Sequence, residues 1–225
     1  MVSLSGIDLL GIDRVLRRGT GEMVAEREGA LLVRDSVSGA YLLGCPDPDA
    51  GHELLDLHVG PDCRLLMVSD HALGMETFTG SGFSEKLECY QTAYYGEKPQ
   101  DDGLISVRTA GADDLPVLEE TYDLISSDEL EKVVMRGSVL LGYSGDRLVG
   151  FIGEHLEGSM GLLYIFPEFR RKGFGTALQR RLITRTIEEG YIPFGQVEKS
   201  NRGSLLLQKK LGMTVSENLI VWMWR

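Results

Sequence analysis

The chain has 225 residues, of which 43% are hydrophobic and 25% charged, an ordinary mixture for a globular protein with a sizeable core. Its net charge of −11 comes mostly from the first 100 residues, which argues against a nucleic-acid partner, because such a partner requires a basic face. No apolar run approaches the roughly 20 residues that cross a bilayer, and no secretory signal is recognisable, so we expect a cytoplasmic protein without membrane contact.

The first half of the chain predicts a small α+β unit. Apolar spacing favours a helix from Ile7 to Met23, and a polar turn then joins two short strands, Gly29–Arg34 and Gly39–Gly44, as a hairpin. The other elements predicted before residue 96 are a helix over 50–59, a strand over 64–69, a helix over 72–78 and a strand over 86–95.

Three cysteines lie in this half, widely spaced and without a Cys-x-x-Cys pair: Cys45, Cys63 and Cys89. The neighbouring histidines stand at no spacing that is typical of metal ligands. We therefore expect free thiols, no disulfide scaffold and no metal site.

A polar stretch around Pro99, residues 96–103, is the best candidate for a linker and predicts two domains, 1–98 and 104–225. After it the pattern predicts the order β-α-α-β-β-β-α-β-α-β. The strands are expected over 105–109, 138–143, 147–156, 160–166, 193–198 and 216–224, with helices starting at 113, 128, 174 and 202.

The stretch from Tyr164 to Leu178 predicts a strand, a basic turn and a helix that together suit a phosphate group. Pro167 ends the strand because it has no N–H to donate. Gly173 and Gly175 let backbone amides approach a ligand that a side chain would keep away. The positive end of the helix dipole points at the turn, where formal charge is added by Arg170, Arg171 and Lys172.

Two motifs in this half resemble one family. Arg170-x-x-Gly173-x-Gly175 resembles the pyrophosphate loop of the GNAT acyltransferases, and residues 197–213 resemble the second conserved block of that superfamily. The spacing of the two motifs is similar to that in the glycine N-acyltransferase branch. The resemblance implies a GNAT fold over residues 104–225, within an α+β chain that has a mixed sheet.

The resemblance also implies a function: transfer of an acetyl or short acyl group from coenzyme A to a primary amine of a small molecule or amino acid. Acetyl-CoA would be the co-substrate, without a metal. The residues implied in coenzyme binding are Leu163, Tyr164, Ile165, Arg170, Arg171, Lys172, Gly173, Phe174, Gly175, Thr176, Asn201 and Ser204. Asn201 is equally well interpreted as the N-cap of the following helix. A coenzyme-binding module without turnover remains the alternative function.

Catalysis of this kind requires an oxyanion donor and a way to deprotonate the amine. The resemblance implies that the backbone N–H of Leu163 faces the thioester oxygen. The glutamate and tyrosine that the family often uses are missing, since strand 160–166 has no carboxylate and Gln208 stands where the tyrosine is expected.

Glu154 is the predicted base, because it interrupts an apolar strand where a buried carboxylate would bind a proton more readily. The alternative interpretation is that Glu154 lies at a solvated end of the strand. Other candidates for the base are Glu157, Glu198 and water, and His155 is the only histidine in this half.

Residues 1–98 follow a similar order of strands and helices but contain no counterpart of the basic glycine turn. We predict a degenerate second GNAT-like unit that binds no coenzyme and walls the acceptor site, with an unrelated α+β domain as the alternative. The sequence leaves the oligomeric state open.

Overall fold

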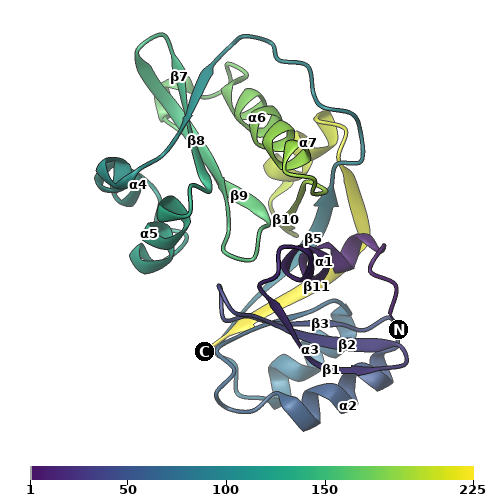
Figure 1. The fold of residues 1–225 in the computed structure, drawn as a ribbon. Coiled ribbons are helices and arrows are strands. Elements are labelled where there is room, and N and C mark those ends of the chain that lie inside the picture. Colours follow the sequence, from purple (N-terminus) through teal and green to yellow (C-terminus); the bar gives the residue numbers. More distant parts are fainter. Residues whose placement is uncertain (1) are drawn as a thin grey trace. The chain divides into compact units, whose positions relative to one another are not determined.

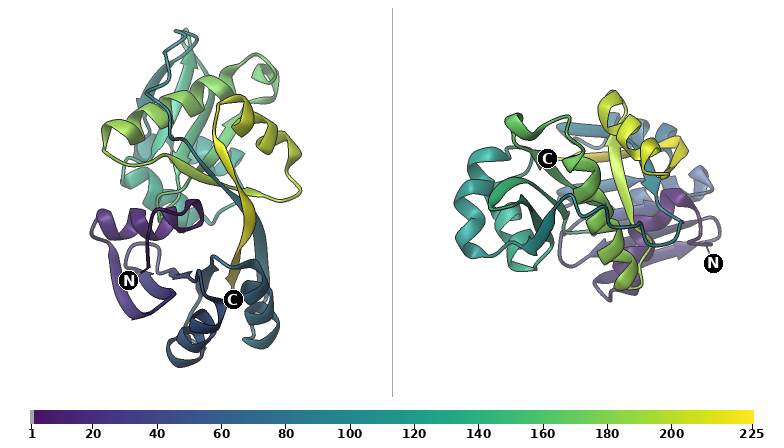
Figure 2. Two further views of the ribbon diagram at one scale, coloured as in Figure 1. Left: turned by 90° about the vertical axis from the view of Figure 1, so that its right-hand side faces the viewer. Right: turned by 90° about the horizontal axis from the view of Figure 1, so that it is seen from above.

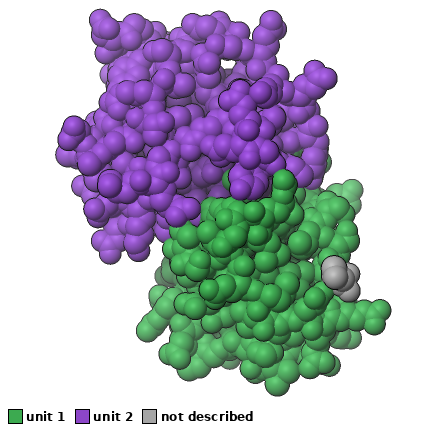
Figure 3. All heavy atoms as spheres, in the orientation of Figure 1, with its two compact units in different colours: residues 1–93, 196–209, 213–225 green, residues 94–195, 210–212 purple. Residues whose placement is uncertain are grey.

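The computed structural model describes residues 2–225, which form two compact units (Figure 3). Unit 1 holds the chain up to Ala93 together with Gln196–Lys209 and Met213–Arg225. Unit 2 holds Tyr94–Gly195 and Lys210–Gly212.

Unit 1 contains a six-stranded sheet in the order β1-β2-β3-β4-β11-β5, with only the β3–β4 pair parallel. Its elements are η1 (Ile7–Leu9), α1 (Leu10–Arg17), β1 (Gly21–Arg27), β2 (Ala30–Asp35), β3 (Tyr41–Gly44), α2 (Pro48–His58), β4 (Leu65–Val68), α3 (His71–Gly80), β5 (Glu85–Ala93), most of α7 (Arg202–Lys210) and β11 (Thr214–Trp224). The predicted hairpin is confirmed as β2–β3. The predicted segments 1–98 and 104–225 do not coincide with the two units, because β11 pairs with β4 and β5.

The helix predicted from Ile7 to Met23 is wrong in its second half. The helix ends at Arg17, and Gly19 then adopts a left-handed φ of 75° that turns the chain. Residues 21–27 follow as β1 and pair with β2. Met23, the predicted end of the helix, therefore belongs to an edge strand.

The core of unit 1 covers both faces of its sheet, because successive strand residues point to opposite sides. On one face Leu32, Leu66 and Val221 pack with Leu54 of α2 and Leu73 of α3. On the other face the neighbouring residues of the same strands pack against α1, through Leu31, Met67, Ile220, Ile12 and Val15. Strand β11 therefore contributes to both halves of this core.

Glu88 on β5 binds two lysines and a histidine of unit 1. Its carboxylate lies 2.6 Å from Lys199 Nζ, 2.6 Å from Lys86 Nζ and 2.8 Å from His71 Nε2. The hydrogen bond from Lys199, followed by those from Lys86 and His71, lowers the pKa of Glu88 to about 2. Because the folded pKa is depressed, the stabilisation is present above the usual glutamate pKa and is lost as the pH falls from about 4.5 to 2.

Replacing Glu88 with glutamine is expected to lower the free energy of unfolding by about 1 kcal/mol at pH 7, since two lysines and a histidine then lose their shared carboxylate partner. The deficit should narrow as the pH falls below about 4.5. Urea unfolding of the parent and of Glu88→Gln at pH 7 and pH 3.5 measures this difference in the free energy of unfolding. The exposed Glu85 on the same strand gives the control, Glu85→Gln, and an equal effect of the two substitutions would contradict the prediction.

Unit 2 contains a sheet in the order β10-β9-β8-β7-β6, in which only the β9–β10 pair is parallel. Its elements are β6 (Ser106–Thr109), η2 (Ala112–Asp114), α4 (Leu115–Thr121), α5 (Ser127–Met135), β7 (Val139–Ser144), β8 (Arg147–Glu154), β9 (Met160–Ile165), η3 (Pro167–Phe169), α6 (Phe174–Glu188) and the first residues of β10 (Phe194–Glu198). The element order predicted for residues 104–225 is confirmed.

Helices cover both faces of the unit 2 sheet. Figures 1 and 2 show α6 on one side of these strands and α4 and α5 on the other. Leu178 of α6 leaves no room for a side chain at Gly142 of β7, where an added Cβ would lie 2.9 Å away. On the opposite face Tyr122, after α4, meets the ring of Phe151 edge-on at 5.9 Å.

The predicted linker contains no helix or strand, but it is attached to α6 within unit 2. Asp102 binds Arg180 at 3.0 Å, and Asp101 binds Arg181 at 2.6 Å. The segment is therefore held along its own unit rather than extended. No helix in the described part of the chain is long and apolar enough to span a membrane.

Candidate active site

Strand β9 contains a bulge on the edge that faces β8. The register shifts between Gly161 and Tyr164, so that Leu162 and Leu163 stand opposite the single residue Ile152. Leu162 has a φ of 52°, in the left-handed region that a leucine adopts only under the constraint of its surroundings. Strain of this kind clusters at functional sites and makes the bulge a candidate.

Aromatic rings support the bulge from the side of α4. Phe151 stacks on Tyr164 at 5.5 Å, and the backbone of Leu162 donates a hydrogen bond to the hydroxyl of Tyr122. Burial, followed by the nearby charge of Glu129, raises the pKa of Tyr122 to about 12. Tyr122 therefore keeps its proton throughout the physiological range and cannot serve as a base.

The opposite edge of β9 separates from β10 almost at once. The two parallel strands are in register at one position, Met160 opposite Gly195. Past that pair, residues 161–165 have no second strand partner in the described chain. Backbone donors and acceptors on that edge are the kind of groups that an extended ligand uses as a surrogate strand.

The turn after β9 leads directly into an uncapped helix. Arg171 has a φ of 62° and Gly173 a φ of 91°, and α6 starts at Phe174 with no side-chain cap on Gly173. The first N–H groups of a helix have no intrahelical partner, and they carry the positive end of the dipole. This end of α6 is suited to an anion.

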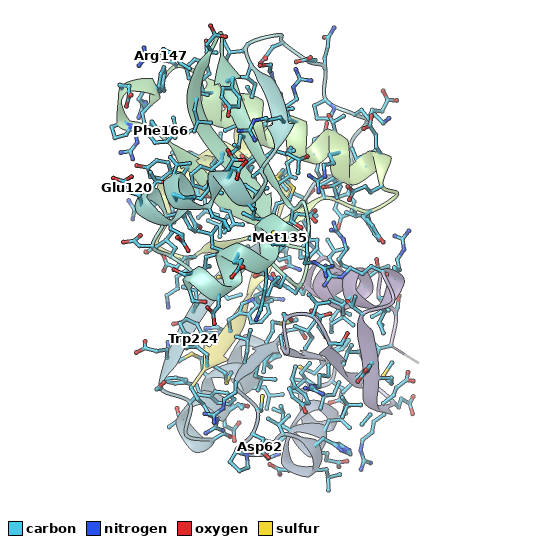
Figure 4. All side chains as sticks on the ribbon, turned by 60° about the vertical axis from the view of Figure 1, so that its left-hand side comes forward. Asp62, Glu120, Met135, Arg147, Phe166 and Trp224 are labelled. Atoms are coloured by element: carbon cyan, nitrogen blue, oxygen red, sulfur yellow. The ribbon has the colours of Figure 1, made fainter. Side chains whose placement is uncertain are left out.

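Three basic side chains, all of them exposed, surround this helix end: Arg170, Arg171 and Lys172. Arg170 Nε donates to the carbonyl of Ile165 at 2.9 Å, and Lys172 Nζ donates to the carbonyl of Glu168 at 2.8 Å. These bonds fold the side chains back onto the turn. Figure 4 labels Arg147 and Phe166 at this end of unit 2. The structure therefore places a basic loop in front of the first amides of α6, and phosphate binding there stays a prediction.

Glu154, the predicted base, ends β8 and is only 8% exposed, so the alternative of a solvated strand end is wrong. The hydroxyl of Thr186 on α6 donates to its carboxylate at 3.1 Å. Glu154 thus lies on the α6 face of the sheet. The other carboxylates considered from the sequence accept bonds from neighbouring hydroxyls, Glu157 from Ser159 and Glu198 from Ser200.

His155, given little weight from the sequence, lies on the opposite face of the sheet. Its Nδ1 is 3.4 Å from the carboxylate of Glu129 on α5. Its ring fills the space over Gly161, where an added Cβ would come within 2.4 Å of Nε2. One signal was available: Ser126-x-x-Glu129 has the form of a capping box, and Ser126 does cap α5, but the glutamate side chain is directed to the histidine.

Residues 142–222, which include this strand, turn and helix, match the model of the FR47-like protein family. No curated protein matches the chain. A GNAT-family protein from Novosphingobium aromaticivorans is 17% identical, with a TM-score of 0.59 over 95% of both chains. The chain has the GNAT fold.

Two further solved structures share the GNAT fold over most of the chain. A GCN5-related N-acetyltransferase-like protein from Streptococcus suis is 14% identical, with a TM-score of 0.58 over 96% of this chain and 92% of its own. A Drosophila protein is 18% identical, with a TM-score of 0.65 over 88% of this chain and 74% of its own. The similarity to the glycine N-acyltransferase branch stays a prediction.

The second predicted block of the GNAT resemblance lies in unit 1, except for Lys210–Gly212. Asn201 accepts the backbone N–H of Ser204 at 3.0 Å, which confirms its interpretation as a helix cap. The described contacts of Asn201 and Ser204 do not bear on coenzyme binding. Their part in coenzyme binding therefore stays a prediction. The predicted residues that the structure brings together in unit 2 are those from Leu163 to Thr176.

The corresponding strands and helix of unit 1, as far as the structure describes them, differ from those of the candidate site in unit 2. Its parallel strands β3 and β4 stay in register at three consecutive positions, and β2 and β3 pair without a shift. The helix that follows, α2, is capped by Asp47, whose carboxylate accepts the N–H of Asp49 at 3.1 Å. Pro48 removes a further N–H from that helix end. The start of α2 therefore already carries an acidic cap of its own.

Proposed function

We propose that this protein is an N-acyltransferase that transfers an acetyl or short acyl group from coenzyme A to a primary amine of a small molecule or amino acid. The observation that carries the proposal is the continuity of three features along one stretch of unit 2. The bulge at Leu162, the open edge of β9 and the uncapped basic start of α6 follow one another between residues 161 and 176.

Each feature meets one requirement of the reaction. The amides from Arg171 to Thr176 would hold the pyrophosphate, with neutralisation by Arg170 and Lys172. The open edge from Leu163 to Ile165 would bind the pantetheine arm by backbone hydrogen bonds. The N–H of Leu163 would stabilise the oxyanion of the tetrahedral intermediate, which is worth about 3 kcal/mol where such a donor is preorganised.

The prediction from the sequence that Glu154 is the base rests on its burial. It requires that Glu154→Gln lower the rate at neutral pH while the affinity for coenzyme A stays the same. Its bond with Thr186 gives the same carboxylate a structural role, which a thermal unfolding measurement on the variant would reveal.

Unit 1 enters the proposal as a degenerate GNAT-like unit that binds no coenzyme of its own. Its order of three antiparallel strands, helix, parallel strand, helix and strand, from β1 to β5, repeats the order from β7 to β11. The capped α2 and the closed β3–β4 pair support the absence of a second coenzyme site.

The test has two readouts. Calorimetry with coenzyme A should give one site per chain, and a panel of amino acids, diamines and amino sugars should release free thiol from acetyl-CoA. Binding without thiol release from any amine would favour the alternative, a coenzyme-binding module without turnover. No binding, or two sites per chain, would overturn the proposed site or its restriction to unit 2.

A further inference from the structure

We infer that His155, held by Glu129, is the group that takes the proton from the acceptor amine. The inference rests on the proposed acyl transfer, and it assigns the proton transfer to the α5 face of the sheet instead of the α6 face where Glu154 lies. Four observations on unit 2 carry it, each from a different element.

The first observation is the fixed orientation of the imidazole. Glu129 accepts a hydrogen bond from Nδ1 at 3.4 Å, so the neutral ring carries its proton there and presents a lone pair at Nε2. A carboxylate in this position also stabilises the imidazolium that forms when Nε2 takes up a proton. The pair has the arrangement of a base with its orienting group.

The second observation is the position of Nε2. It lies against Gly161, the first residue of β9 beyond the last pair with β10 and the residue directly before the bulge. Gly161 is required here, because any Cβ would displace the ring. Gly161 is two residues before Leu163 on β9. Nε2 therefore lies near the end of the open edge that is farther from the basic turn.

The third observation is access. The side chain of His155 is 28% exposed and that of Glu129 is 33% exposed, so both side chains are in contact with solvent. Glu154, in contrast, is buried under α6 and bonded to Thr186. Tyr122 is excluded by its raised pKa.

The fourth observation is the charge around the ring. Burial opposes protonation of His155, but the hydrogen bond that its Nδ1 donates to Glu129 on α5 and the charge of Glu157 in the β8–β9 turn prevail and raise its pKa. The residue of β9 that faces the ring is Gly161, which carries no charge. Two carboxylates near one imidazole also attract an ammonium group, the form in which a primary amine arrives at neutral pH.

The proton inventory of the step is balanced. The acceptor ammonium gives one proton to Nε2, and the neutral nitrogen attacks the thioester carbonyl carbon. The C–S bond breaks with its electron pair on sulfur, and the second amine proton passes to the thiolate. The imidazolium then returns its proton to water, so one proton is released per amide formed.

The kinetic test compares three variants with the parent, using acetyl-CoA and the best amine of the panel. His155→Gln should lower kcat/KM at least a hundredfold, as expected for loss of a general base, and keep the Kd for coenzyme A. Glu129→Gln should keep partial activity and shift the acidic limb of the pH profile down by about one unit, because the main cause of the raised pKa is removed. The control variant Glu131→Gln changes an exposed residue of the same helix. It should leave the acidic limb of the pH profile unshifted.

An NMR titration tests the inference without an acceptor. The His155 resonance, assigned from its loss in His155→Gln, should shift when acetyl-CoA is added, and much less with free coenzyme A, which has no acyl group. Coenzyme A binding with an unmoved His155 signal would overturn this inference and leave the proposed function intact. An acidic limb that survives in His155→Gln and disappears in Glu154→Gln would assign the proton transfer to Glu154.

Discussion

Replacing Gly173 with aspartate is expected to weaken coenzyme A binding at least about a hundredfold. The residue precedes α6 with a φ of 91°, so any side chain strains the turn. The aspartate also places a negative charge at the helix end where the phosphates are proposed to lie. Isothermal calorimetry with coenzyme A measures the effect.

Two control variants separate backbone strain from charge. Gly173→Ala strains the same turn without the charge and should lose much less affinity. Gly190→Asp introduces the same side chain at the other end of α6, at a glycine with a φ of 84°, and should bind as the parent does. Unchanged binding by Gly173→Asp would exclude a phosphate site at this turn.

Replacing Gly150 with alanine is expected to cost about 3 kcal/mol of unfolding free energy and to weaken acetyl-CoA binding as well. An added Cβ would lie 2.2 Å from the carbonyl oxygen of Tyr164, a backbone atom that cannot rotate away. Overpacking of this kind displaces the neighbouring strand. The strand displaced here is β9, next to its bulge.

Thermal and urea unfolding measure the first effect, and calorimetry with acetyl-CoA measures the second. Gly111→Ala is the matched control, because it lies in the same unit with an extended φ of −126° and has no atom within 4 Å of an added Cβ. A Gly150→Ala protein as stable as Gly111→Ala would show that β8 and β9 are not packed as described.

The parts of the site that were predicted from the sequence are those with local signals. Pro167, Gly173 and the apolar spacing after Phe174 define a strand end, a turn and a helix through steric rules that act within a few residues. The same holds for the buried position of Glu154. Each of these predictions depends on neighbours in the chain and survives without knowledge of the tertiary fold.

The features that the sequence did not predict depend on contacts between residues far apart in the chain. Nothing about a leucine indicates a left-handed φ, so the bulge at Leu162 follows only from the register that β8 imposes. Glu129 and His155 meet across 26 residues, through the docking of α5 on the sheet. The assignment of β11 to unit 1 is also a long-range choice, made by its partners β4 and β5.

The position of β11 has a consequence for how the protein is made. Residues 214–224 are synthesised long after Ala93, yet they fill the place between β4 and β5 in the unit 1 sheet, whose other strands end at Ala93. During translation β4 and β5 must therefore wait with two unpaired strand edges until residues 214–224 have been made. A ribosome stalled shortly before residue 214 would hold a nascent chain that a chaperone, or another copy in the same state, can bind.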